Sequence, residues 1–124
     1  MSWTVEYLPK LGLIESTFVG RVTLEEFKEA TIRSVELTTR HNVNLFLVDD
    51  SKWEGGASVF DLVALIDSYR DLKLPSASRG AFILPASNTQ AEKDVRFFET
   101  ACRNRSWTAR VFTDRENAIA WLTE

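Results

Sequence analysis

The strongest constraint on the fold is a regular alternation of short apolar runs with longer segments of helical periodicity. The apolar runs are NLFLV (44–48), AFIL (81–84) and ARVF (109–112). Runs of this length without polar alternation are typical of strands that are buried on both faces in parallel sheets. Two earlier runs, WTVEY (3–7) and LIESTFV (13–19), alternate at period two, and Pro9 and Gly12 between them favour a turn. We therefore predict an N-terminal β-hairpin followed by three buried strands.

The segments after the hairpin carry helix start signals. Thr23 and Glu26 have the spacing of a capping box, in which each residue satisfies a backbone N–H group of the other. The same spacing recurs in three later pairs, which are Ser58 with Asp61, Thr89 with Glu92, and Thr113 with Glu116. The predicted order is ββαβαβαβα. Strands that alternate with helices require parallel crossovers, so we predict one α/β domain over residues 1–124, with a mixed, mostly parallel sheet and four helices.

Composition excludes several classes of function. The net charge of −3 argues against a nucleic-acid partner, because such proteins need a concentrated basic face. Cys102 is the only cysteine and His41 the only histidine, so we expect no intrachain disulfide and no metal site built from several histidines or cysteines. No apolar run approaches the roughly 20 residues that span a bilayer, and the first residues do not have the pattern of a signal peptide. We expect a cytoplasmic protein without a membrane span.

The segment DDSKWEGGAS (49–58) is the main candidate for a functional site. It follows a predicted strand at the end where open α/β sheets bind ligands. Asp49 and Asp50 could hold a metal or accept a phosphoryl group, but that chemistry needs further acids and a lysine after a late strand, and both are missing. The alternative is that one aspartate caps backbone N–H groups while the other faces water. Gly55 and Gly56 favour a turn with positive φ, since no nucleotide-binding pattern surrounds them.

Two further side chains in this segment have alternative interpretations. Trp53 lies in a predicted loop, where it either folds back onto the core or lines a ligand or partner surface. Ser58 is predicted to cap a helix, and a phosphate there would meet the positive end of the helix dipole. Nucleophilic catalysis is not supported, because the sole candidate base, His41, precedes the strand. We expect that the protein is not an enzyme.

Several phrases of the sequence resemble the SpoIIAA-like family, which is related to STAS domains. They are GRVTLEEF (20–27), LFLVDDS (45–51), SVFDL (58–62), RFFETACRNR (96–105) and RVFTDRENAIAWL (110–122). The resemblance implies a sheet surrounded by helices, no cofactor, and a role in protein–protein switching or in binding amphipathic small molecules. In STAS-type anti-sigma-factor antagonists, a serine in a compact turn after a strand that ends in aspartate is phosphorylated. This makes Ser51 and Ser58 candidate phosphosites, although KWEGGA separates them here.

Two functional hypotheses follow. The first is a non-enzymatic interaction or regulatory domain that forms a homodimer, because the helix after Ser58 carries more apolar groups than one core-facing stripe requires. The second is a carrier or sensor of a small amphipathic ligand. The candidate ligand or partner surface consists of Asp49, Asp50, Trp53, Phe60 and Val63.

Overall fold

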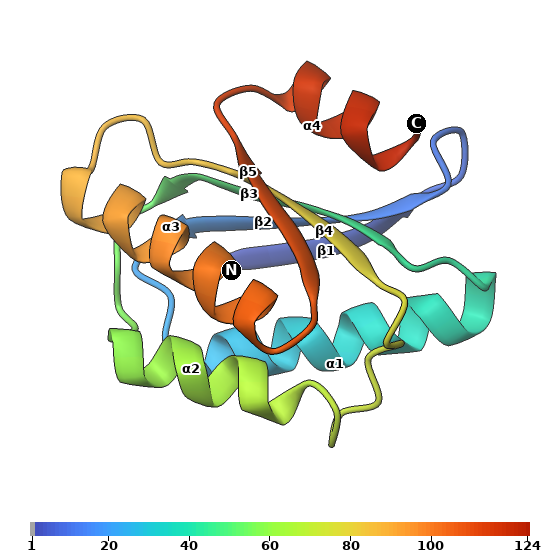
Figure 1. Cartoon of the computed structure of the whole chain (residues 1–124), viewed down its shortest axis with the longest axis horizontal. Helices are drawn as coiled ribbons and strands as arrows, with labels where there is room; N and C mark the ends of the chain where they lie inside the picture. The colour runs from blue at the N-terminus through green and yellow to red at the C-terminus, as the bar shows by residue number, and fades with distance from the viewer. Residues whose placement is uncertain (1) are drawn as a thin grey trace.

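The computed structural model describes residues 2–124 and has the predicted order of elements (Figure 1). The strands are β1 (Trp3–Leu8), β2 (Leu13–Gly20), β3 (Leu45–Trp53), β4 (Arg79–Ile83) and β5 (Thr108–Phe112). The helices are α1 (Leu24–His41), α2 (Val59–Ser68), α3 (Thr89–Asn104) and α4 (Arg115–Leu122). The predicted α/β class is confirmed.

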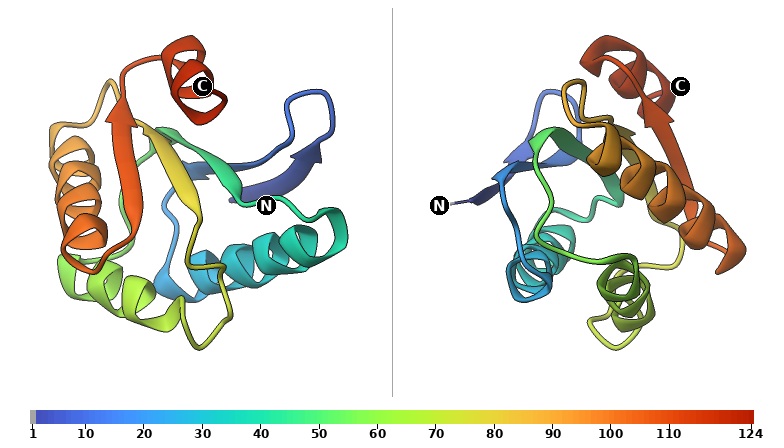
Figure 2. Two further views of the ribbon diagram at one scale, coloured as in Figure 1. Left: turned by 45° about the vertical axis from the view of Figure 1, so that its right-hand side comes forward. Right: turned by 90° about the vertical axis from the view of Figure 1, so that its left-hand side faces the viewer.

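The five strands lie in the sheet in their chain order, β1-β2-β3-β4-β5. The hairpin pair β1–β2 is antiparallel, and every other neighbouring pair is parallel. Because each new parallel strand is added on the same side of the previous one, right-handed crossovers place their helices on one face. Accordingly α1, α2 and α3 pack against one face of the sheet, and α4 packs against the other (Figures 1 and 2).

Two of the four predicted helix starts are confirmed. Thr23 and Ser58 are the N-caps of α1 and α2, and both form the complete capping box. The predicted starts of α3 and α4 are wrong by one residue, since Asn88 caps α3 and Asp114 caps α4. Asn and Asp cap at least as well as Thr, so the chain uses the residue next to each predicted threonine.

Strand β3 is longer than predicted and contains a β-bulge. It runs to Trp53, so the first half of DDSKWEGGAS is strand and not loop. Thr17 pairs with Asp49 and Val19 pairs with Lys52, so β3 advances three residues where β2 advances two. An extra residue in one strand reverses the alternation of its side chains. The bulge therefore directs Trp53 to the face covered by α1–α3, where its ring lies 5.9 Å from that of Phe27.

The remainder of the segment, residues 54–57, is a tight connection to α2. The Glu54 N–H donates to the carbonyl of Gly20 at 2.9 Å, and the Val22 N–H donates to the carbonyl of Gly55 at 2.8 Å. Gly55 and Gly56 have φ of 101° and 108°, so the predicted turn with positive φ is confirmed. These contacts fix the place where α2 begins to cross the sheet.

Candidate functional site

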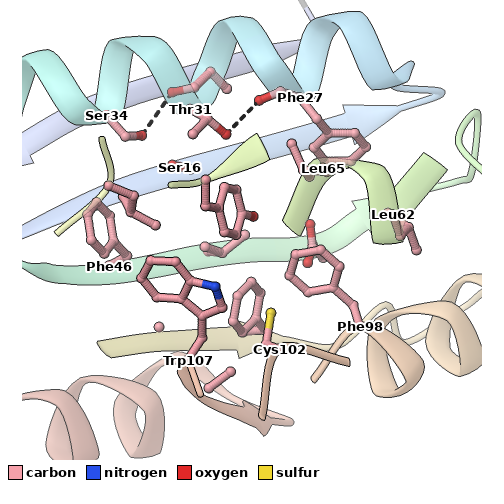
Figure 3. A pocket seen from close by; sticks show the side chains of 18 of the residues that line it. Ser16, Phe27, Thr31, Ser34, Phe46, Leu62, Leu65, Phe98, Cys102 and Trp107 are labelled. Carbon is pink, nitrogen blue, oxygen red and sulfur yellow. Dashed lines mark hydrogen bonds between the residues drawn. The ribbon is translucent and has the colours of Figure 1, made fainter. Parts of the chain in front are cut away.

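A partly open cavity lies between the sheet and helices α1, α2 and α3 (Figure 3). Its volume is about 120 Å³, and strands β2 to β5 supply its floor. Eight aromatic side chains contribute to its wall: Phe18, Phe27, Phe46, Trp53, Tyr69, Phe82, Phe98 and Trp107. An apolar cavity of about 150 Å³ in another protein binds benzene, so this space is large enough for a small organic molecule.

Asp50 is the only carboxylate that lines the cavity. Phe46, Val48 and Asp50 occupy every second position of β3, so their side chains point to the same face of the sheet and all three line the cavity. Asp50 is 6% exposed, and within residues 2–124 its carboxyl group forms no hydrogen bond or ion pair. Burial raises the pKa of Asp50 well above its ordinary value, and the neighbouring charge of Asp49 adds to the shift.

Three hydroxyl groups in the wall, those of Thr31, Ser34 and Ser78, differ from Asp50, because each donates to a backbone carbonyl. Thr31 and Ser34 donate to the carbonyls of Phe27 and Ala30, one turn earlier in α1, each at 2.9 Å (Figure 3). Ser78 donates to the Pro75 carbonyl at 2.6 Å. These bonds satisfy the hydroxyl donors locally. Within residues 2–124, the Asp50 carboxyl and the buried Trp53 indole N–H are thus polar groups without a hydrogen-bond partner in a mostly apolar cavity.

The other titratable groups of the wall are Tyr69 and Cys102. Burial raises the pKa of Tyr69 well above its ordinary value, and Cys102 and Asp50 add to this. Burial likewise raises the pKa of Cys102 to about 12, so the thiol is protonated at neutral pH. Among residues 2–124, no lysine, arginine or histidine lines the cavity. The wall therefore offers no positive charge to a ligand.

The structure separates the two adjacent aspartates. Asp49 lies on the opposite face with Leu47, and it accepts a hydrogen bond from the Ser51 N–H at 2.9 Å. This confirms that one aspartate caps a backbone N–H group. The expectation that the other faces water is wrong, because the alternation of β3 turns Asp50 into the core.

Of the predicted surface residues, only Asp50 and Trp53 line the cavity. Trp53 is 2% exposed, so it belongs to the interior and not to a loop surface. Phe60 is 83% exposed on the first turn of α2, and Val63 is half-buried outside the cavity wall. The cavity lies against the sheet face, whereas the sequence predicts a site beyond the strand ends, and that prediction stays untested.

The candidate phosphosites lie apart from the cavity wall. Ser51 is half-buried in β3, and Ser58 is exposed at the start of α2. The Ser58 hydroxyl accepts from the Asp61 N–H at 3.1 Å, and the Ser58 N–H donates to the Asp61 carboxylate at 2.9 Å. Ser58 is therefore a helix cap, and phosphorylation of either serine stays a prediction.

Most of the wall consists of residues that the sequence analysis does not single out, among them Tyr69, Phe98 and Trp107. Ser16 was overlooked, although it stands between Ile14 and Phe18 on the inward face of β2. A serine at an otherwise apolar core position was the available signal, because buried hydroxyl groups need a polar partner.

Within 2–124, no group of three or more His, Cys, Asp or Glu residues could hold a metal ion. No helix in the same range is long and apolar enough to cross a membrane.

The five-stranded mixed sheet with four helices is an α/β fold that also occurs in a solved structure. Among solved structures, the chain is similar to an uncharacterised protein from the DUF3478 family with a SpoIIAA-like fold from Shewanella loihica PV-4. The two share 18% sequence identity, and the match has a TM-score of 0.55 and covers 98% of this chain and 93% of that chain. No family model and no curated protein matches the sequence. The likeness confirms the fold expected from the resemblance.

Proposed function

We propose that this protein is a non-enzymatic binding domain that carries or senses a small amphipathic ligand in the cavity beneath α1, α2 and α3. The observation that carries the proposal is the unpartnered Asp50 carboxyl in an aromatic wall. A core that encloses about 120 Å³ forgoes on the order of 3 kcal/mol of packing free energy. A ligand that fills the cavity restores the missing packing contacts and so recovers this free energy. Its polar group forms the hydrogen bond that the Asp50 carboxyl lacks.

The titratable groups of the wall support binding over catalysis. The cavity holds one carboxyl, one phenol and one thiol, and the thiol pKa of about 12 leaves no nucleophilic thiolate. Within the described chain, no histidine or lysine reaches the wall to act as a partner base. An activated nucleophile needs such a base or a lowered pKa.

Filling the cavity should abolish ligand binding. Ala30 on α1 lines the cavity, and Ala30→Leu adds three carbon atoms to that space. We expect the variant to bind 1-butanol at least about 10-fold more weakly than the wild type, because a few buried methylene groups already change affinity by that factor. Chemical shifts of the tryptophan indole N–H groups measure the titration, since Trp53 and Trp107 belong to the wall.

Ala120→Leu is the matched control, because it makes the same change at an exposed position of α4. It should bind 1-butanol as the wild type does. Equal affinities for all three proteins would contradict binding in this cavity. Native mass spectrometry of protein freshly purified from cells should also show an added mass in the wild type that Ala30→Leu lacks.

Self-association through the first turn of α2 is the second candidate function. Phe60 is 83% exposed and Val59 is 38% exposed, which leaves a large apolar side chain in water. We expect light scattering to show a homodimer of the wild type and a monomer of Phe60→Glu, with little change in unfolding free energy. Ile32→Glu alters an exposed apolar residue of α1 and should leave the dimer intact. A wild-type protein that stays monomeric at high concentration rules out this function.

A further inference from the structure

We propose that the cavity selects small amphipathic amines, with the nitrogen of the ligand bonded to the Asp50 carboxyl and its apolar part against the aromatic wall. This inference rests on the proposed binding function and names the class of ligand. It starts from the charges that line the cavity. Among the described residues of the wall, Asp50 is the only carboxylic acid, and no basic side chain lines the cavity. An anionic ligand would find no counter-charge and would face a carboxyl group.

The position of Asp50 is set by the fold. The alternation of β3 places it in the cavity beside Phe46 and Val48, and the bulge that follows brings Trp53 to the same space. The carboxyl is more than nine-tenths buried and, among residues 2–124, has no hydrogen-bond partner. A buried polar group without a partner is costly, so a ligand that donates hydrogen bonds to it gains free energy. An ammonium group offers three donors.

The aromatic wall suits a cation that has left water. Phe18 and Phe27 have ring centroids 4.6 Å apart, and Phe27 in turn lies edge-on to Trp53. Aromatic faces attract ammonium groups, and the attraction grows when the site excludes water. A carboxyl group surrounded by such rings therefore favours an amine over an alcohol of the same size.

The proton balance follows from the groups around Asp50. Asp49 precedes it on β3, Tyr69 faces it from the end of α2, and Cys102 faces the cavity from α3. The parts of α1, β2, β4 and β5 that line the cavity contribute no titratable side chain. Where the Asp50 carboxyl is protonated, a neutral amine takes its proton and becomes the paired ammonium, and an amine that arrives as ammonium displaces that proton to water. Where the carboxyl is ionised, an ammonium pairs with it directly. In each case the bound state is an ammonium–carboxylate pair.

Three probes of equal length test the inference on the full chain: n-butylamine, 1-butanol and butyrate. In the wild type we expect n-butylamine to bind at least about 10-fold more tightly than 1-butanol, as charge-assisted hydrogen bonds are the stronger kind, and butyrate more weakly than both. In Asp50→Asn, the preference for n-butylamine over 1-butanol should disappear, because the amide cannot form an ion pair with the ammonium group. Indole N–H chemical shifts report binding of each probe.

The results distinguish the inference that the ligand is an amine from the proposed binding function. If 1-butanol binds and n-butylamine binds no better, the amine inference is overturned and the binding function stands. Butyrate as the tightest ligand overturns the inference as well. If none of the three probes binds, both proposals fail. The comparison of probes on the wild type needs no variant, so it stands even if Asp50→Asn folds poorly.

Discussion

Replacing Asp50 with leucine is expected to stabilise the protein by about 2 to 3 kcal/mol at pH 8, although it removes the central polar group of the cavity. Asp50 is buried without a partner, so the fold bears the cost of holding a carboxyl group in an apolar space. Leucine has a similar branched shape and adds apolar contacts to the wall. For a chain of 124 residues this gain corresponds to roughly 10 °C in the midpoint of thermal unfolding.

The stabilisation should depend on pH in a defined direction. Burial raises the pKa of Asp50 above its value of 3.8 in the unfolded chain. Between these two values the folded state holds the proton that the unfolded state has lost, so wild-type stability falls as pH rises through this window. The leucine variant has no carboxyl group at position 50, so its stability should not fall for this reason as the pH rises. The difference between the two proteins should be smallest near pH 4 and should grow as the pH rises toward 8.

Asp49→Leu provides the matched control on the neighbouring residue. The Asp49 carboxylate accepts a hydrogen bond from the Ser51 N–H, so its loss should destabilise the fold by about 1 kcal/mol. Adjacent aspartates should thus give effects of opposite sign in denaturant unfolding. A stability difference for Asp50→Leu that is the same at pH 4 and pH 8 would show that packing, and not the carboxyl group, is the cause.

The fold could be predicted because its signals are local. Four capped helical segments and short apolar runs fix the order of elements, and parallel crossovers restrict the topology. The two misplaced helix starts illustrate the limit of such signals. At α3 and α4, two adjacent residues could each serve as the cap, and only the path of the chain selects between them.

The site could be predicted only in part, because its key feature depends on pairing between strands. The segment after Val48 contains two aspartates, a serine and a lysine, which favour a loop by composition. The structure extends β3 through these residues because β2 supplies hydrogen-bonding partners as far as Gly20. The bulge then decides which side chains face inward. No periodicity within one strand reveals a bulge, because it is defined by the register with the neighbour.

Gly56→Ala is expected to destabilise the protein by about 3 kcal/mol. A Cβ atom at this position would lie 2.7 Å from the backbone oxygen of Val22, and φ is +108°, a conformation that L-residues rarely adopt. The backbone must therefore shift. Because Gly55 is hydrogen-bonded to Val22 and residues 54–57 lead into α2, this shift moves the helix that covers the cavity. The affinity for 1-butanol should fall together with the unfolding free energy.

Gly12→Ala separates the effect of the contact from that of the backbone conformation. Gly12 also has a positive φ, +67°, but a Cβ atom there meets nothing within 4 Å. Its cost should be about 1 kcal/mol, with no change in affinity for 1-butanol, because the hairpin turn lies outside the cavity wall. Equal losses of stability in the two variants would mean that the contact with Val22 is not decisive. A destabilised Gly56→Ala that keeps its affinity would show that α2 holds its place over the cavity without this connection, through its packing on α1 and α3 alone.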